Sequence, residues 1–84
     1  MLYLSDAQTA TLERMASEGI QVIGIIPTDD EVSDDRIILG IMPRKWYEVG
    51  TWMLYQNGST GNGHYFTSHQ AAYDDADKRR RRGY

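Results

Sequence analysis

The spacing of apolar side chains near the start of the chain indicates an amphipathic helix, with Met15 in its apolar stripe. Ser5 and Gln8 have the spacing of a capping box, in which each side chain hydrogen-bonds to the backbone of the other residue. Gly19 can adopt the left-handed conformation that ends many helices. Together these features predict a helix over residues 6–18.

Two runs rich in β-branched residues follow, at residues 20–26 and 36–42, and each stops at a proline. Nearly continuous apolar runs of this kind are typical of strands that are covered on both faces. The polar connection at residues 28–35 is too short for a parallel crossover. The two runs therefore predict an antiparallel hairpin.

Residues 46–56 alternate between two faces and predict a third strand. The Asn57-Gly58 pair is a turn signal, and the polar residues up to Gly63 predict a long loop before a short return strand at residues 64–66.

A second helix is predicted after that strand, with Thr67 or Ser68 as its N-cap and Thr67 and Gln70 as a second capping box. We expect it to fray into a basic tail at residues 79–84. The whole chain, residues 1–84, then forms a single α+β domain: an antiparallel sheet of three to four strands flanked by an N-terminal and a C-terminal helix. Both helices are expected to cover one face of the sheet, because a bare small sheet could not bury its isoleucines.

Composition agrees with one globular domain, since 40% of the 84 residues are hydrophobic and 25% are charged. The absence of cysteine excludes disulfides and thiolate zinc sites. No apolar stretch approaches the ~20 residues that a membrane span needs, and the first residues lead us to expect no signal peptide. We therefore expect a cytoplasmic protein without a membrane segment and without a cofactor.

Charge is unevenly distributed along the chain. Residues 1–43 contain eight acidic and two basic side chains, whereas residues 44–84 contain four acidic and seven basic ones. Five of the acids are clustered between the first two strands, and these are Asp29, Asp30, Glu31, Asp34 and Asp35. A calcium loop would need a central glycine and a distal glutamate, and both are missing. The cluster is therefore either a solvated turn or a surface that docks onto a basic protein groove, of the kind that otherwise binds nucleic acid.

The aromatic residues are mostly tyrosine and tryptophan, which carry a polar atom and are enriched at protein interfaces. Trp46 and Tyr47 directly follow two basic residues, and we interpret them as a candidate binding hot spot. The alternative is that the tryptophans fill the core and the tyrosines surround it. Stacking of unpaired bases on the tyrosines is a further alternative.

Four consecutive arginines, Arg79, Arg80, Arg81 and Arg82, are the candidate phosphate contacts. The acids that precede them offer a different interpretation, because Asp75 and Asp77 stand four residues before Arg79 and Arg81. Such pairs stabilise a helix, and cations suit its C-terminal end.

Catalytic and metal sites are not predicted. His64 and His69 flank the junction between a strand and a helix and lack a third ligand, so a zinc site is not expected. Ser68 is explained as an N-cap and not as a nucleophile. We therefore expect a protein without catalytic residues.

In size, lack of cysteine, acidic balance and helix-and-sheet organisation, the chain resembles the small inhibitors encoded by phages and mobile elements, among them the anti-CRISPR proteins. The resemblance covers the chain in outline and assigns no residue a role. It implies a stoichiometric binder that blocks a host protein or protein–nucleic-acid complex. The alternatives are a small nucleic-acid-binding protein that uses the arginines and exposed tyrosines, or a structural homodimer joined through an edge strand or the second helix.

Overall fold

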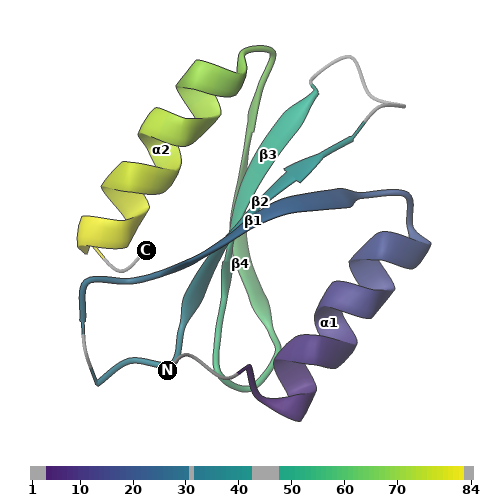
Figure 1. Ribbon diagram of the computed structural model, residues 1–84, viewed down its shortest axis with the longest axis vertical. Helices are drawn as coiled ribbons and strands as arrows, with labels where there is room; N and C mark the ends of the chain where they lie inside the picture. Colours follow the sequence, from purple (N-terminus) through teal and green to yellow (C-terminus); the bar gives the residue numbers. More distant parts are fainter. Residues whose placement is uncertain (1–3, 31, 43–47, 83–84) are drawn as a thin grey trace.

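The computed structural model describes residues 4–30, 32–42 and 48–82, and within them the fold is α+β as expected. A single antiparallel sheet has the strand order β1-β2-β3-β4, and one helix precedes it while the other follows it (Figure 1). In chain order the elements are α1 (Asp6–Ser17), β1 (Gln21–Pro27), β2 (Arg36–Ile41), β3 (Val49–Leu54), β4 (Thr60–Phe66) and α2 (His69–Arg82).

Helix α1 begins and ends as its sequence predicts. The Gln8 backbone N–H donates to Ser5 Oγ at 3.1 Å, and the Ser5 N–H donates to Gln8 Oε1 at 2.9 Å, so the capping box is confirmed. Gly19 has a φ of +91°, and the Ile20 N–H donates to the Met15 carbonyl at 3.0 Å. This is the backbone pattern of a Schellman stop.

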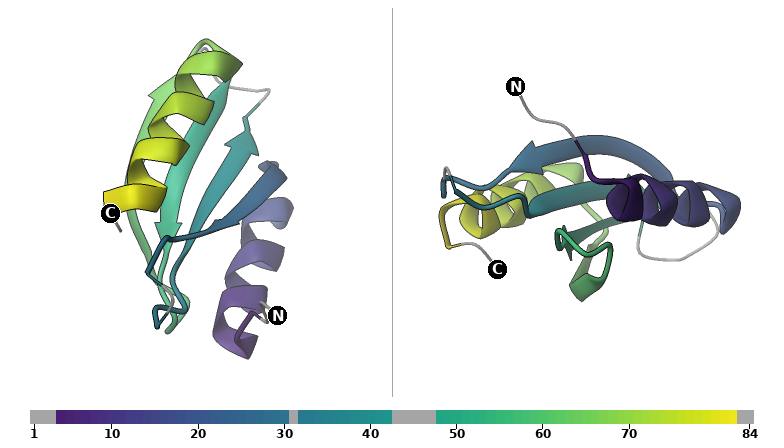
Figure 2. Two further views of the ribbon diagram at one scale, coloured as in Figure 1. Left: turned by 60° about the vertical axis from the view of Figure 1, so that its left-hand side comes forward. Right: turned by 90° about the horizontal axis from the view of Figure 1, so that it is seen from below.

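The sheet is a simple antiparallel meander in which every strand pairs with its neighbour in sequence. The predicted hairpin of the first two strands is confirmed. The register of the β1–β2 pair shifts between Val22 and Gly24, and that of the β3–β4 pair shifts between Thr51 and Met53. Figure 2 shows the twist of the sheet, with β1 and β4 at its two edges.

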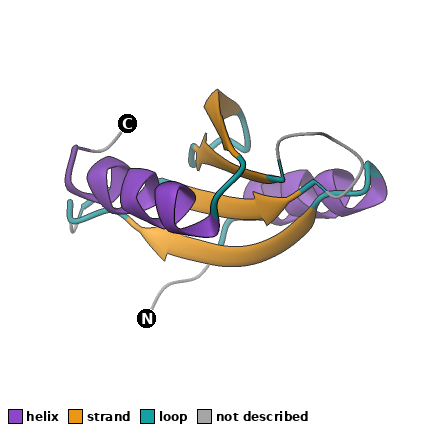
Figure 3. Ribbon diagram, turned by 90° about the horizontal axis from the view of Figure 1, so that it is seen from above, coloured by secondary structure: helices purple, strands orange, loops and turns teal. Residues whose placement is uncertain are grey.

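The two helices pack on opposite faces of the sheet, and this corrects the expectation that both cover one face. Neighbouring residues of β2 point in opposite directions: Ile38 packs against Met15 of α1, while Ile37 packs against Ala76 of α2. Figures 1 and 3 show the strands as a twisted layer with one helix on either side. Since β2 is buried on both faces, the apolar character of its whole run is accounted for. The same prediction is wrong for β1, which is an edge strand whose outward-facing isoleucines are 39% and 41% exposed.

The α1 face of the sheet is organised around Trp52. Its indole lies against glycines of its own strand and of both neighbouring strands. A Cβ added at Gly50 would stand 2.6 Å from the ring, and one added at Gly40 would stand 3.2 Å from it. The edge of the Tyr65 ring packs against the indole with a centroid distance of 5.8 Å. Trp52 therefore fills the core, as one of the interpretations of the aromatic residues predicts.

The turn between β3 and β4 is shorter than expected. The Gly58 N–H donates to the Tyr55 carbonyl, and β4 begins at Thr60, so most of the predicted loop belongs to the strand. Gly58 has a φ of +88°, and its carbonyl accepts a hydrogen bond of 2.6 Å from Thr11 of α1. Glycine is required here because a Cβ would stand 2.7 Å from the Ala7 carbonyl oxygen.

Helix α2 is longer and better anchored than the sequence suggested. Ser68 Oγ accepts from the Ala71 N–H, but Gln70 donates to Asp74 instead of completing a capping box with Thr67. The expected fraying does not begin at residue 79, since the helix continues to Arg82. Its buried stripe consists of Ala72, Ala76 and Arg79. Arg79 is thus anchored against the sheet within the part of the helix that was expected to fray.

Candidate functional site

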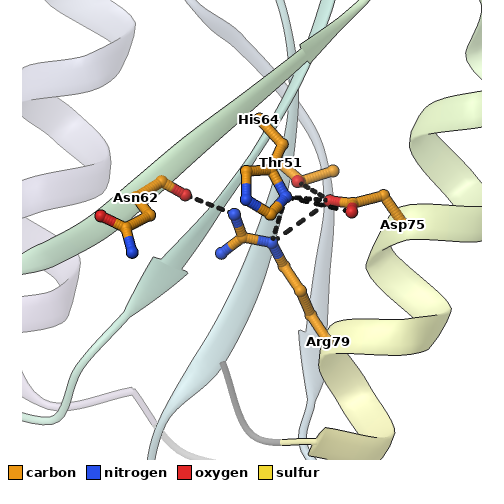
Figure 4. A network of polar contacts seen from close by, with 5 residues as sticks. All are labelled: Thr51, Asn62, His64, Asp75 and Arg79. Atoms are coloured by element: carbon orange, nitrogen blue, oxygen red, sulfur yellow. Dashed lines mark hydrogen bonds and ion pairs between the residues drawn. The ribbon is translucent and has the colours of Figure 1, made fainter.

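The densest polar network joins α2 to β3 and β4 (Figure 4). Asp75 lies at its centre: Thr51 Oγ1 donates to Asp75 Oδ2 at 2.6 Å, and His64 Nδ1 is 2.9 Å from the same oxygen. Arg79 Nε is 3.2 Å from Asp75 Oδ2, and the Arg79 guanidinium also donates to the Asn62 carbonyl. Strand register places these groups together, because His64 is paired with Thr51 on the face that α2 covers.

The protonation of the network follows from its geometry. A carboxylate can only accept, so the His64 Nδ1 atom beside it carries a proton and donates. Arg79 Nε lies 3.2 Å from both His64 Nδ1 and Asp75 Oδ2, and since the ring nitrogen is already a donor, the guanidinium hydrogen goes to the carboxylate. In neutral His64 the lone pair is thereby left on Nε2, on a side chain that is 46% exposed.

The pKa of Asp75 is shifted by opposing effects. Burial by itself raises it, but the hydrogen bonds from Thr51 and His64, the charge of Arg79 and the charge that His64 carries when protonated together lower it by more, so that the pKa lies below its usual value. Asp75 is therefore ionised at neutral pH. The Arg79 side chain, of which 3% is exposed, therefore has a counter-charge at neutral pH.

This network fastens the helix to the sheet, because each of its donors is directed inward at Asp75 or at a backbone carbonyl. A histidine oriented by a carboxylate also occurs in catalytic triads. Here the nearby hydroxyl, that of Thr51, donates to the same carboxylate and not to the histidine. The sequence indicated the Asp75–Arg79 pair through its four-residue spacing. It missed His64 and Thr51, which join that pair only through strand pairing.

The acidic segment between β1 and β2 is anchored to three other parts of the fold. The Asp29 N–H donates to the Arg80 carbonyl at 2.9 Å, and its carboxylate pairs with the Arg80 guanidinium at 2.9 Å. The Asp34 carbonyl accepts from Nε2 of the fully buried Gln8 at 2.8 Å. Asp35 Oδ1 accepts from the Gln56 N–H at 3.1 Å.

Internal hydrogen bonds shape the same segment. Asp30 Oδ1 accepts from the Val32 N–H, and the Ser33 N–H donates to the Asp30 carbonyl. The side chains of Asp30 and Asp34 remain exposed, and Val32 is 91% exposed between them. Residues 29–30 and 32–35 are thus held in place while they present carboxylates and one apolar side chain to solvent.

The arginine run is largely paired within the molecule. Arg79 is buried in the network above, and Arg80 pairs with both Asp29 and Asp77. The hydrogen bond between Asp77 and Arg80 lowers the pKa of Asp77 and raises that of Arg80. Arg81 contacts Asp77 at 3.2 Å, which confirms the predicted four-residue pair. Arg82 is exposed.

Three candidate residues, Glu31, Trp46 and Tyr47, lie outside the described residues. Within the described part of the chain, no group of three or more histidine and carboxylate side chains is placed to bind a metal ion. No helix among those residues is long and apolar enough to cross a membrane. No protein-family model, curated protein or solved structure matches the chain.

Proposed function

We propose that the protein is a non-enzymatic binding module that docks onto another protein through the acidic segment, residues 29–35. By its outline it is an inhibitor of the phage-encoded, anti-CRISPR-like kind, acting in the host cytoplasm on a protein or complex that binds nucleic acid. Trp46 and Tyr47 are the proposed hot spot of the same interface. Carboxylates held in place can occupy a groove that otherwise binds phosphates.

The main support is that the acidic segment is fixed by contacts to the rest of the fold while several of its side chains are exposed to solvent. Ordering a flexible loop during association reduces affinity, so a loop that is already fixed in the free protein binds at a lower entropic cost. Contacts to Arg80, Gln8 and Gln56 fix the segment in this way. Val32, which is almost fully exposed, supplies an apolar contact at the centre of a charged surface.

Nucleic-acid binding is the less favoured alternative, because the guanidinium groups of Arg79, Arg80 and Arg81 are engaged with carboxylates. A phosphate would have to compete with these pairs. Among the arginines of the run, Arg82 has no such carboxylate partner within the described residues.

The proposal is tested by affinity capture from host lysate with four forms of the protein. These are the wild type, Val32→Asp, the double variant Asp30→Asn/Asp34→Asn, and Asp74→Asn as a control that removes an exposed acid from α2. We expect a specific partner to be retained by the wild type and by the control. Val32→Asp should weaken its binding about thirtyfold, as expected for a hot spot of about 2 kcal/mol.

The double variant should slow association most strongly at low salt. Trp46→Ala tests the other half of the interface in the same assay. Addition of the protein should also displace nucleic acid from the captured partner. Equal capture by all forms would refute the acidic interface, and binding of nucleic acid that is lost on removing residues 79–84 would favour the alternative.

A further inference from the structure

A shallow pocket opens beside the acidic segment, where the start of β2 meets the turn between β3 and β4. Its walls come from five residues, namely Asp35, Tyr55, Gln56, Asn57 and Ser59. All five are polar, and all but one lie in or next to the turn.

Hydrogen bonds and packing hold the residues that line this pocket. The Gln56 N–H donates to Asp35 Oδ1 at 3.1 Å, and the Gln56 carbonyl accepts from Ser5 Oγ at 2.9 Å. Asn57 Oδ1 accepts from both the N–H and the hydroxyl of Ser59, at 3.0 Å and 2.7 Å. The ring of the half-buried Tyr55 packs against the core cluster beneath α2. A ligand would therefore enter a preorganised site.

The pocket is rich in acceptors and carries one carboxylate. Asp35 Oδ1 is engaged by the Gln56 amide, while Asp35 Oδ2 has no hydrogen-bond partner among the residues that the structure describes. The buried Arg36 guanidinium donates to the Asp35 carbonyl at 2.9 Å and does not line the pocket. An aromatic ring beside an available carboxylate oxygen suits a planar cation, which can stack on the ring and donate to the oxygen together.

We propose that this pocket binds an arginine side chain of the partner protein. The inference rests on the proposed function, because it identifies which part of a partner lies next to the acidic segment. The exposed carboxylates of Asp30 and Asp34 lie in the same segment as Asp35 and attract a basic surface. The guanidinium is then held by Asp35 and Tyr55.

The test needs no knowledge of the partner. The ¹⁵N-labelled full chain is titrated with N-acetyl-arginine amide and, separately, with N-acetyl-citrulline amide, a neutral compound of nearly the same shape. The arginine compound should shift the backbone resonances of residues 55–59 saturably, with a dissociation constant of about 1–10 mM, as one small side chain permits. The citrulline compound should shift them far less.

Asp35→Asn is the matched variant, because its side-chain oxygen can still accept from the Gln56 N–H while its charge is lost. It should weaken binding of the arginine compound about fivefold. If this variant does not fold, the comparison of arginine with citrulline on the wild-type protein decides alone.

Equal shifts from the two compounds, or no shifts at residues 55–59, would overturn the assignment of the pocket. That result would leave the acidic interface intact, provided that lysate capture still depends on Val32. Conversely, a failed capture with a positive titration would refute the proposed interface and retain the pocket.

Discussion

Removing the charge of Asp75 should destabilise the protein strongly, because Asp75 neutralises a guanidinium that is almost fully buried. Asp75→Asn preserves the size of the side chain and an oxygen that can accept from Thr51. It leaves the Arg79 side chain, which is 3% exposed, with neutral oxygen acceptors and without a counter-charge in the network. Breaking a buried pair from one side costs about 3–5 kcal/mol, and since 18% of Asp75 is exposed, we expect the lower end, about 3 kcal/mol.

Urea unfolding at pH 7, followed by circular dichroism, measures this loss. For a domain of this size the free energy of unfolding falls by about 1 kcal/mol per molar urea, so the midpoint should drop by about 2–3 M. Asp74→Asn is the control, since Asp74 is exposed on the same helix and accepts from Gln70 on that helix. Its midpoint should stay close to that of the wild type.

A second substitution separates charge from packing. In Asp75→Asn/Arg79→Met the unpaired guanidinium is removed and an apolar chain of similar length takes its place, so at least half of the lost stability should return. The reasoning is refuted if Asp75→Asn unfolds within about 0.5 kcal/mol of the wild type. It is also refuted if Arg79→Met adds a further loss in the Asp75→Asn background.

Three further outcomes follow from the same structure. Because the pKa of Asp75 is lowered in the folded state, its contribution to stability is present above the unfolded-state pKa and is lost as the pH falls through the folded-state pKa. The free energy of unfolding, measured by urea unfolding between pH 2 and 5, should therefore depend less steeply on pH in Asp75→Asn than in the wild type. Gly50→Ala should cost about 1–3 kcal/mol by urea unfolding, since the new methyl group meets the Trp52 ring at 2.6 Å, whereas Gly24→Ala meets only ordinary contacts and should be tolerated. Gly58→Ala should lower the melting temperature by at least about 5 °C, because it combines a positive φ with a backbone clash, and an unchanged melting temperature would contradict this account.

Features set by near neighbours in sequence could be predicted well. The capping box of Ser5 and Gln8 and the stop at Gly19 depend on atoms within a few residues, and both are present. The hairpin of β1 and β2 was also predictable, because its connection is too short for any crossover. All of these features depend on residues close together in sequence and not on how the rest of the chain packs.

Features set by strand pairing and layering could not be predicted in the same way. His64 meets Asp75 only because β4 has one extra residue between its partners of Met53 and Thr51, and this shift in register places His64 opposite Thr51 and beneath α2. The opposite placement of the two helices was misjudged, although the apolar run of β2 had already indicated a strand covered on both faces. The similar run of β1 misled, because β1 lies at the edge of the sheet. The burial of Arg79 was not predicted, since its position in the buried stripe of α2 depends on how that helix docks.

The two charged clusters that the sequence offered as rival sites are in contact, and this bears on which of them is available to a partner. Asp29 and Arg80 are joined both through their side chains and through the backbone, so part of each cluster neutralises the other. The two clusters differ in how many charged side chains remain exposed and unpaired. The acidic segment keeps the carboxylates of Asp30 and Asp34 on a fixed loop, whereas the arginines up to Arg81 are paired. A basic partner can therefore bind without breaking an internal ion pair, while a phosphate backbone would have to break several to contact more than the end of α2.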